Sequence, residues 1–218
     1  MKVGTDGVLL GAWVDVAGAE RILDVGTGTG LIALMLAQRG SARIDAVEID
    51  GAAAQQAQEN IEQSPWADRV QVYPTALQSY AAHCSDRYDV VVSNPPFFEN
   101  DLPAANTART LARHNDRLSP RDLVQSATRL LSEQGRLAVI YPVDTAHQVL
   151  QIAADYGLTC RRQLAIKPKA HLPVKRIALE LCRDAKLEPE TTLVIEEPAR
   201  HVYTPEFIAL IKDFYLKY

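Results

Sequence analysis

A glycine-rich turn between an apolar strand and a helix constrains the fold of this chain most. Residues 21–26 form a short apolar run that ends in glycine, residues 24–30 read DVGTGTG, and residues 31–39 have the composition of a helix. Glycine lets a backbone turn tightly and lets a ligand approach it closely. The segment therefore predicts a buried parallel strand, a ligand-binding turn and a helix; the alternative is an ordinary tight turn without a ligand.

The spacing and charge of this turn indicate the kind of ligand. Glycines at 26, 28 and 30 follow the pattern GxGxG, whereas the dinucleotide fingerprint is GxGxxG, and position 31 is leucine. Asp24 would repel a pyrophosphate, so a cationic or amine-bearing ligand suits the turn better.

The rest of the chain alternates between strand-like and helix-like segments, which is typical of an α/β fold with a parallel sheet and right-handed crossovers. The closing strands follow one another without long helices, which favours an antiparallel addition at one edge. Further strands are predicted over 44–50, 69–73, 88–93, 135–141, 158–166, 174–182 and 191–195, and helices over 31–39, 51–63, 119–132, 144–156 and from Thr204-Pro205 to near the end.

A long polar segment over 95–118 interrupts this alternation. It is rich in Asn, Arg and Pro and has little periodicity. Loops of this length inside a compact domain are usually functional lids or mobile segments. We interpret 1–218 as a single domain and 95–118 as its long active-site loop.

Two polar positions follow the next strands. Glu48 ends the second strand, where a carboxylate can accept both hydroxyls of a ribose; alone, it could equally be a solvated strand-end acid. Residues 94–97 (NPPF) follow the fourth strand. Asn94 offers an amide oxygen, proline removes competing N–H donors, and Phe97 can stack on a flat ring. Alone, the segment could be an Asn-Pro turn with a core phenylalanine.

Together, residues 24–30, Glu48 and residues 94–97 resemble class I S-adenosylmethionine-dependent methyltransferases that modify amino groups. Residues 2–7 (KVGTDG), 9–13 (LLGAW), 58–66 (QENIEQSPW) and the terminal Phe214-Tyr215 are similar to the bacterial tRNA1(Val) (adenine(37)-N6)-methyltransferase family. The resemblance implies a Rossmann-like fold. Its mostly parallel seven-stranded sheet would have an antiparallel edge strand and helices on both faces.

The resemblance also implies roles for single residues. S-adenosylmethionine would be bound by Thr5, Asp6, Asp24, Gly26, Gly28, Gly30, Glu48 and Asn94. Asn94, Pro95, Pro96 and Phe97 would form the catalytic tetrad, which binds the target amine and stacks on its base. Leu77 stands where related enzymes carry an acid for the adenine ring of the cofactor. The family has an aromatic and basic stretch before KVGTDG, so we expect either an internal start or loss of that RNA contact.

The net charge of −4 is unevenly placed. Residues 1–100 hold six Lys or Arg against thirteen Asp or Glu, and residues 101–218 hold 17 against 14. A basic stretch beside a methyl-transfer pocket could follow RNA phosphates, although solvated surface charge is the alternative. The candidates for RNA contact are Arg109, Arg113, Arg117, Arg161, Arg162, Lys167, Lys169, Lys175 and Arg176.

The sequence gives no sign of a metal site, a disulfide framework or a membrane anchor. Cys84, Cys160 and Cys182 are widely spaced, and the apolar run 31–37 is too short to cross a bilayer. We expect a cytoplasmic monomer without metal.

The activity expected is transfer of a methyl group to adenine N6 in tRNA, at the adenine 3′ of the valine anticodon. The open alternatives are a protein glutamine-N5 methyltransferase, another rRNA or DNA adenine-N6 methyltransferase, and a non-catalytic nucleotide-binding module.

Overall fold

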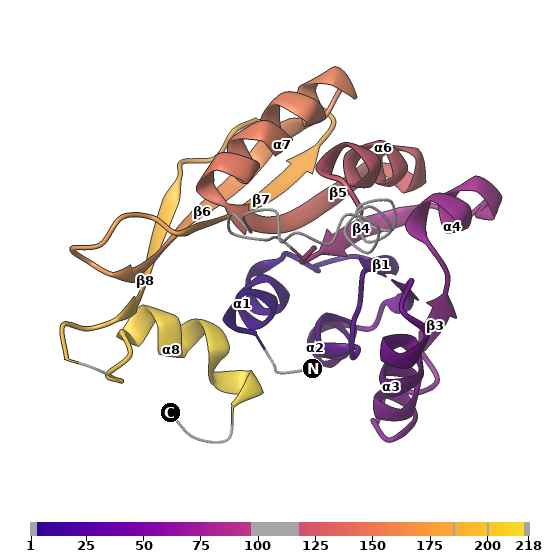
Figure 1. The fold of residues 1–218 in the computed structure, drawn as a ribbon, viewed down its shortest axis with the longest axis horizontal. Coiled ribbons are helices and arrows are strands. Elements are labelled where there is room, and N and C mark those ends of the chain that lie inside the picture. Colours follow the sequence, from indigo (N-terminus) through magenta and orange to yellow (C-terminus); the bar gives the residue numbers. More distant parts are fainter. Residues whose placement is uncertain (1–3, 97–117, 185, 200, 216–218) are drawn as a thin grey trace, which may run out of the picture.

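The protein is built on one twisted eight-stranded sheet with helices on both faces (Figure 1). The computed structural model describes residues 4–96, 118–184, 186–199 and 201–215. The strands lie in the order β3-β2-β1-β4-β5-β7-β6-β8. Their bounds are β1 Arg21–Val25, β2 Arg43–Glu48, β3 Val70–Pro74, β4 Tyr88–Ser93, β5 Leu131–Pro142, β6 Thr159–Lys169, β7 Arg176–Cys182 and β8 Thr191–Glu196.

Two apolar cores lie on opposite faces of this sheet. One contains residues of α1 (Thr5–Trp13), α2 (Leu31–Arg39), α3 (Gly51–Glu62) and α8 (Pro205–Ile211). The other contains residues of α4 (Leu77–His83), α6 (Pro120–Leu130) and α7 (Val143–Asp155). Figure 1 shows the two groups of helices below and above the sheet. Because the central strands carry helices on both faces, they are apolar on both, as in β4 (YDVVVS).

The sheet confirms the predicted fold class and differs from it in two details. The structure has eight strands where the resemblance implied seven, because β8 pairs in parallel with β6. The antiparallel strand β7 lies between β5 and β6 and not at the edge. Consequently, the carboxyl end of β6 and the start of β7 lie on the same side of the sheet as the carboxyl ends of β1, β2 and β4. Below, the two edges of the sheet are this side, with the carboxyl ends of β1, β2 and β4, and the opposite side.

Two helices escaped prediction from the sequence. The reason for α1 is its burial, since all residues from Gly7 to Ala12 are buried and show no polar face. Gly11 brings α1 close to α2, because a Cβ at that position would lie 2.8 Å from the Met35 sulfur. The other helix, α4, has only seven residues, which is too short for a clear periodic pattern.

Candidate functional site

The glycine turn that follows β1 has the backbone conformation that only glycine adopts readily. Gly26, Gly28 and Gly30 have φ angles of 67°, 60° and 84°. The backbone N–H groups of Gly26 and Thr27 donate to the Val47 carbonyl, which fixes the turn against β2. A Cβ on Gly26 would meet no atom within 4 Å, whereas one on Gly30 would lie 3.5 Å from Ala57 of α3. The turn is therefore packed at its end and open at its start, where a ligand can approach.

Asp24 lies fully buried under this turn. Its Oδ2 accepts hydrogen bonds from the Thr27 hydroxyl at 2.6 Å and from the Ala33 N–H at 3.1 Å, while its Oδ1 has no partner. Burial raises the pKa of the Asp24 carboxyl to about 7, and the nearby Glu48 carboxylate adds to the rise. A cationic amine near this carboxyl would favour its ionised form. The preference of the turn for an amine-bearing ligand stays a prediction.

The raised pKa of the Asp24 carboxyl predicts how the stability of the protein depends on pH. The pKa of the Asp24 carboxyl in the folded protein lies above its ordinary value of 3.8. Between about pH 4 and pH 7, Asp24 keeps its proton in the folded protein and has lost it in the unfolded chain. The free energy of unfolding therefore falls as the pH rises through this window. Asn resembles the protonated form, so Asp24→Asn should become more stable than the parent with rising pH. Urea unfolding of both proteins at pH 5 and 7.5 measures this; an equal stability difference at both pH values would contradict it.

Glu48 and Asn94 lie on either side of this turn. β1 is hydrogen-bonded to β2 on one side and to β4 on the other, with Val25 opposite Val47 and Ser93. The next residues, Glu48 and Asn94, therefore lie beside Gly26. The sheet topology brings together three segments that are widely separated in the chain.

Both oxygens of the Glu48 carboxylate already accept hydrogen bonds from backbone N–H groups. Oε2 accepts from the Gly28 N–H and Oε1 from the Asp50 N–H, each at 2.9 Å. A carboxylate has about four acceptor positions, so each oxygen can still accept from a ligand hydroxyl. Beside it, the apolar side chain of Ile49 is 55% exposed and offers a surface for a flat ring. Sequence reasoning did not single out Ile49, an exposed apolar residue directly after the end of β2.

Asn94 presents an unused acceptor. Its Oδ1 is buried and has no hydrogen-bond partner. Its neighbour Ser93 donates to the Val25 carbonyl at 2.8 Å, which ties the end of β4 to β1. Pro95 is buried and Pro96 exposed. Since buried polar atoms rarely lack a partner, the free oxygen of Asn94 is suited to receive a donor from a ligand.

Helix α1 contributes Thr5 and Asp6 from its first turn at the same edge of the sheet. A Cβ on the following residue, Gly7, would lie 3.6 Å from the amide nitrogen of Asn94. Asp6 also accepts a hydrogen bond from Arg176 at the start of β7.

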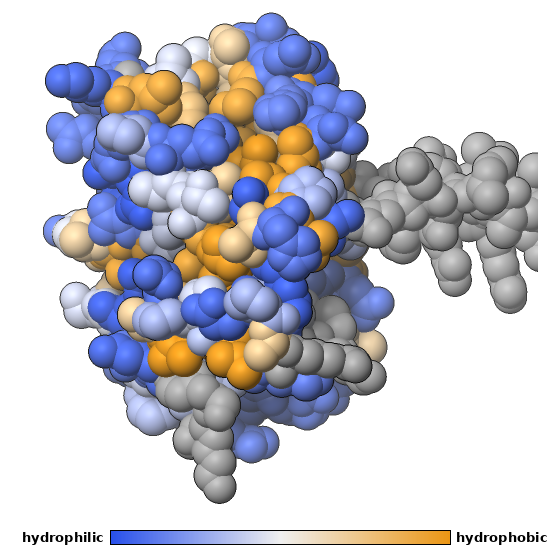
Figure 2. All heavy atoms as spheres, turned by 90° about the vertical axis from the view of Figure 1, so that its left-hand side faces the viewer, coloured by the Kyte–Doolittle hydropathy of each residue, from blue (hydrophilic) through white to orange (hydrophobic). Residues whose placement is uncertain are grey.

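The predicted basic residues divide between the two edges of the sheet. Lys167, Lys169, Lys175 and Arg176 lie at or between the end of β6 and the start of β7, on the side of the glycine turn. Lys167 donates to the Ala170 carbonyl, and Lys169 pairs with Glu196 at 3.7 Å. Figure 2 shows the side of the molecule with β8 and α8, where hydrophilic residues interrupt the apolar ones.

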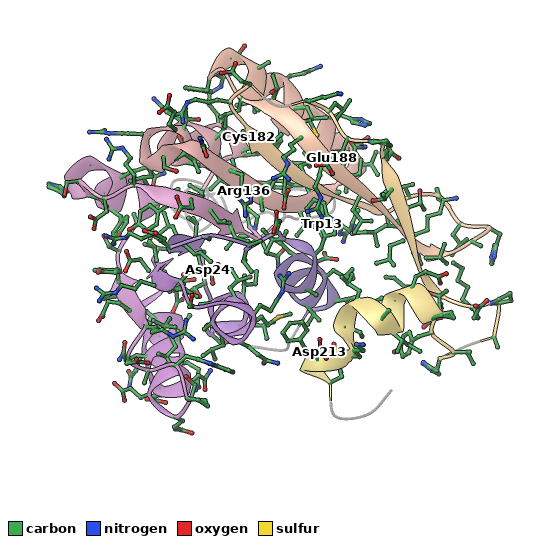
Figure 3. All side chains as sticks on the ribbon, turned by 180° about the vertical axis from the view of Figure 1, so that it is seen from behind. Trp13, Asp24, Arg136, Cys182, Glu188 and Asp213 are labelled. Carbon is green, nitrogen blue, oxygen red and sulfur yellow. The ribbon has the colours of Figure 1, made fainter. Side chains whose placement is uncertain are left out.

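Arg161 and Arg162 lie near the start of β6, at the opposite edge. Arg162 pairs with the fully buried Glu180 at 3.6 Å and lies over the Trp13 ring, and Arg161 pairs with Glu188 at 3.2 Å. Figure 3 labels Trp13 and Glu188, which both contact Arg162. These two arginines therefore connect parts of the fold and are not brought to the glycine turn.

Four predicted residues, Phe97, Arg109, Arg113 and Arg117, lie outside the described residues. Among the residues that the structure does describe, no group of three or more His, Cys, Asp or Glu side chains could hold a metal ion. No helix in the described ranges is both long and apolar enough to cross a membrane.

Comparison of the fold with solved structures supports the architecture. A predicted O-methyltransferase from Agrobacterium tumefaciens superposes with a TM-score of 0.73 over 95% of this chain and 96% of that one, at 18% identity. A ribosomal protein L11 methylase from Lactobacillus delbrueckii gives 0.57 over 81% of this chain and 76% of its own, also at 18% identity. At this identity the likeness concerns the fold alone.

Sequence comparison is more specific. The family described as methyltransferase small domain matches residues 4–157. The tRNA1(Val) (adenine(37)-N6)-methyltransferase of Trichodesmium erythraeum is 58% identical over 100% of this chain and 92% of its own length. The protein of the same name from Parabacteroides distasonis is 48% identical over the same shares. The chain therefore belongs to the tRNA1(Val) (adenine(37)-N6)-methyltransferase family.

Proposed function

We propose that this protein transfers a methyl group from S-adenosylmethionine to N6 of an adenine in tRNA, at position 37 of tRNA1(Val). The observation that carries the proposal is the buried, unpartnered Oδ1 of Asn94 beside the glycine turn. Relatives with 42–58% identity carry this activity in their names. A cytoplasmic location follows from the proposed substrate.

The residues around the glycine turn fit the proposed cofactor. The open backbone at Gly26 leaves room for the methionine part, and the free Oδ1 of Asp24 is suited to interact with its ammonium group. Glu48 can accept from the ribose hydroxyls, and the exposed Ile49 can cover the adenine ring. The last contact needs no carboxylate at Leu77, which is buried in the core between α4 and the sheet.

The mechanism uses acceptor groups and orientation. When bound, S-adenosylmethionine supplies an electrophilic methyl group. The N6 lone pair of adenine is delocalised into the ring, so N6 is a weak nucleophile. Asn94 Oδ1 and the Pro95 carbonyl would each accept a hydrogen bond from one of the two N6–H groups, which favours a tetrahedral nitrogen with its lone pair directed at the methyl group. The S–CH₃ bond breaks as the N6–CH₃ bond forms, and S-adenosylhomocysteine is the leaving product. The methylated N6 then releases a proton to water, so no strong base is required beforehand.

Positioning of the base and of the tRNA involves further residues. Phe97 would stack on the target adenine, which enters the site at least cost from a single-stranded loop. Lys167, Lys169 and Lys175 lie at the edge of the sheet where the base must enter, and they are suited to follow phosphates. Arg161 and Arg162 are left out of this proposed surface because the structure pairs them with acids at the other edge.

Nucleoside mass spectrometry tests the proposal. The protein is incubated with S-adenosylmethionine and with tRNA1(Val) that lacks the modification, and a second tRNA1(Val) with guanine at position 37 is the control. We expect N6-methyladenosine in the first tRNA and none in the control. Methylation of a release-factor glutamine without methylation of tRNA would overturn the proposal in favour of the protein substrate, and methylation of rRNA or DNA alone would overturn it likewise.

A further inference from the structure

An ion pair joins the first turn of α1 to the start of β7. Arg176 Nε donates to Asp6 Oδ2 at 2.9 Å, and the side chains of Arg176 and Asp6 are 19% and 24% exposed. The two residues are 170 positions apart in the chain. Arg176 lies opposite Pro142 of β5 and Ile166 of β6, so two neighbouring strands fix its backbone.

The first turn of α1 also lies close to the Asn94 side chain. Gly7 follows Asp6 and faces both the Asn94 amide nitrogen and Leu31 of α2. A Cβ on Gly7 would lie 3.4 Å from the Leu31 side chain and 3.6 Å from Asn94. A small shift of this turn would therefore alter the surroundings of Asn94.

The two ends of α1 are held in different ways. At its C-terminal end Arg39 donates to the carbonyls of Gly11 and Val14, both at 2.7 Å, and Arg162 donates to the Trp13 carbonyl. At its N-terminal end the cap residue Gly4 provides no side-chain hydrogen bond. Within the described part of the chain, Asp6–Arg176 is the ion pair that reaches this turn.

We infer that Arg176 is a positioning residue for methyl transfer, and not a phosphate contact. It holds the first turn of α1, and through Gly7 it keeps Asn94 in place. This inference rests on the proposed function and gives Arg176 a different role from the RNA contact that the sequence predicted. The neighbouring Lys175 is exposed, and its ammonium group makes no ion pair among the described residues, so Lys175 is the member of the pair that would meet tRNA.

A phosphate contact and a positioning residue affect different measurable quantities, namely the salt dependence of tRNA affinity and the rate at saturation. A lysine that neutralises a phosphate contributes about 0.7–0.9 to the slope of log affinity against log salt. A positioning residue leaves that slope unchanged and alters the rate at saturation, since displacement of reacting groups by about 1 Å can cost up to about 100-fold.

The experiment compares Arg176→Gln with its matched control Lys175→Gln. For both variants we measure tRNA affinity over a salt series and the single-turnover rate at saturating tRNA and cofactor. We expect Arg176→Gln to lower the saturated rate roughly 10-fold to 100-fold with an unchanged salt slope. We expect Lys175→Gln to reduce the slope by about 0.7–0.9 and to weaken tRNA affinity, with a smaller loss of saturated rate than in Arg176→Gln. Arg176→Lys, which keeps the charge, should recover part of the rate. A reduced slope with an unchanged rate in Arg176→Gln would overturn the inference.

A second measurement does not depend on tRNA. Amide hydrogen exchange of residues 5–9 should be faster in Arg176→Gln and in Asp6→Asn than in the parent protein, and the double variant should add nothing further. Lys175→Gln should leave this exchange unchanged. Unchanged exchange in Arg176→Gln would show that the pair does not hold the turn. If the parent protein fails to methylate tRNA, the proposed function fails, and the exchange result still decides the role of Arg176.

Discussion

Replacing Asn94 with alanine should lower the rate of methyl transfer by about 10²–10³-fold at saturating substrates, the range found when one preorganised polar group is removed from an active site. Its Oδ1 is the buried oxygen without a partner at the end of β4. The two other segments around the glycine turn, with Asp24 and Glu48, keep their own hydrogen bonds. Affinity for S-adenosylmethionine should therefore change only a few-fold, as calorimetry can measure.

Asn94→Asp is the matched variant for this test, because it keeps an acceptor oxygen at the same position. It should retain more activity than Asn94→Ala, although its charge alters the site. Ser93→Ala provides a control for the fold, since the Ser93 hydroxyl bonds to the Val25 carbonyl and not to a ligand. Near-parental turnover in Asn94→Ala would contradict the assignment of Asn94 to the target amine.

Replacing Glu48 with glutamine should weaken binding of the cofactor by roughly 10-fold to 100-fold, as expected for loss of hydrogen bonds to a charged acceptor. Glutamine keeps one oxygen, which can still accept from the Gly28 N–H, but its NH₂ group cannot accept from the Asp50 N–H. Urea unfolding of the variant therefore measures how much of the effect comes from the turn and not from the lost ligand contact. Binding of S-adenosylhomocysteine is measured by calorimetry for the parent and the variant.

A ligand without the 2′-hydroxyl makes the Glu48 test specific. The parent protein should bind 2′-deoxy-S-adenosylhomocysteine more weakly than S-adenosylhomocysteine, and Glu48→Gln should lose most of that difference. Glu62→Gln, on the exposed end of α3, is the charge-matched control and should behave like the parent. Equal discrimination by the parent and Glu48→Gln would show that Glu48 does not hold the ribose.

The sequence could predict the parts of the site whose structure is local. The strand, the glycine turn and the helix over 21–39 carry their signals within one short segment. Strands β2 and β4 were predicted in the same way, and their parallel pairing with β1 places Glu48 and Asn94 beside the same turn. Helix α1 could not be predicted in this way, because its buried residues are determined by packing on α2 and the sheet.

The predicted basic surface is a second feature that depends on contacts between distant parts of the chain. Residues 161–176 contain no acid, so the sequence suggested a continuous basic surface. The acids that pair with Arg161 and Arg162 come from distant positions, namely Asp15, Glu180 and Glu188. Only the sheet register reveals that the two ends of β6 lie at opposite edges. The single domain over 1–218 and the monomeric state stay predictions.

The connections of α1 have a consequence for synthesis of the protein on the ribosome. This helix is among the first segments made, yet Arg162 and Arg176, which hold its two ends, are among the last third of the chain. Contacts of such large sequence separation form late, because the intervening chain must first be closed into a loop. A nascent or truncated chain that ends before β7 would therefore contain the glycine turn and the tetrad, but its first helix would lack the contact that aligns them. Methyl-transfer competence would be acquired only when nearly the whole polypeptide has emerged.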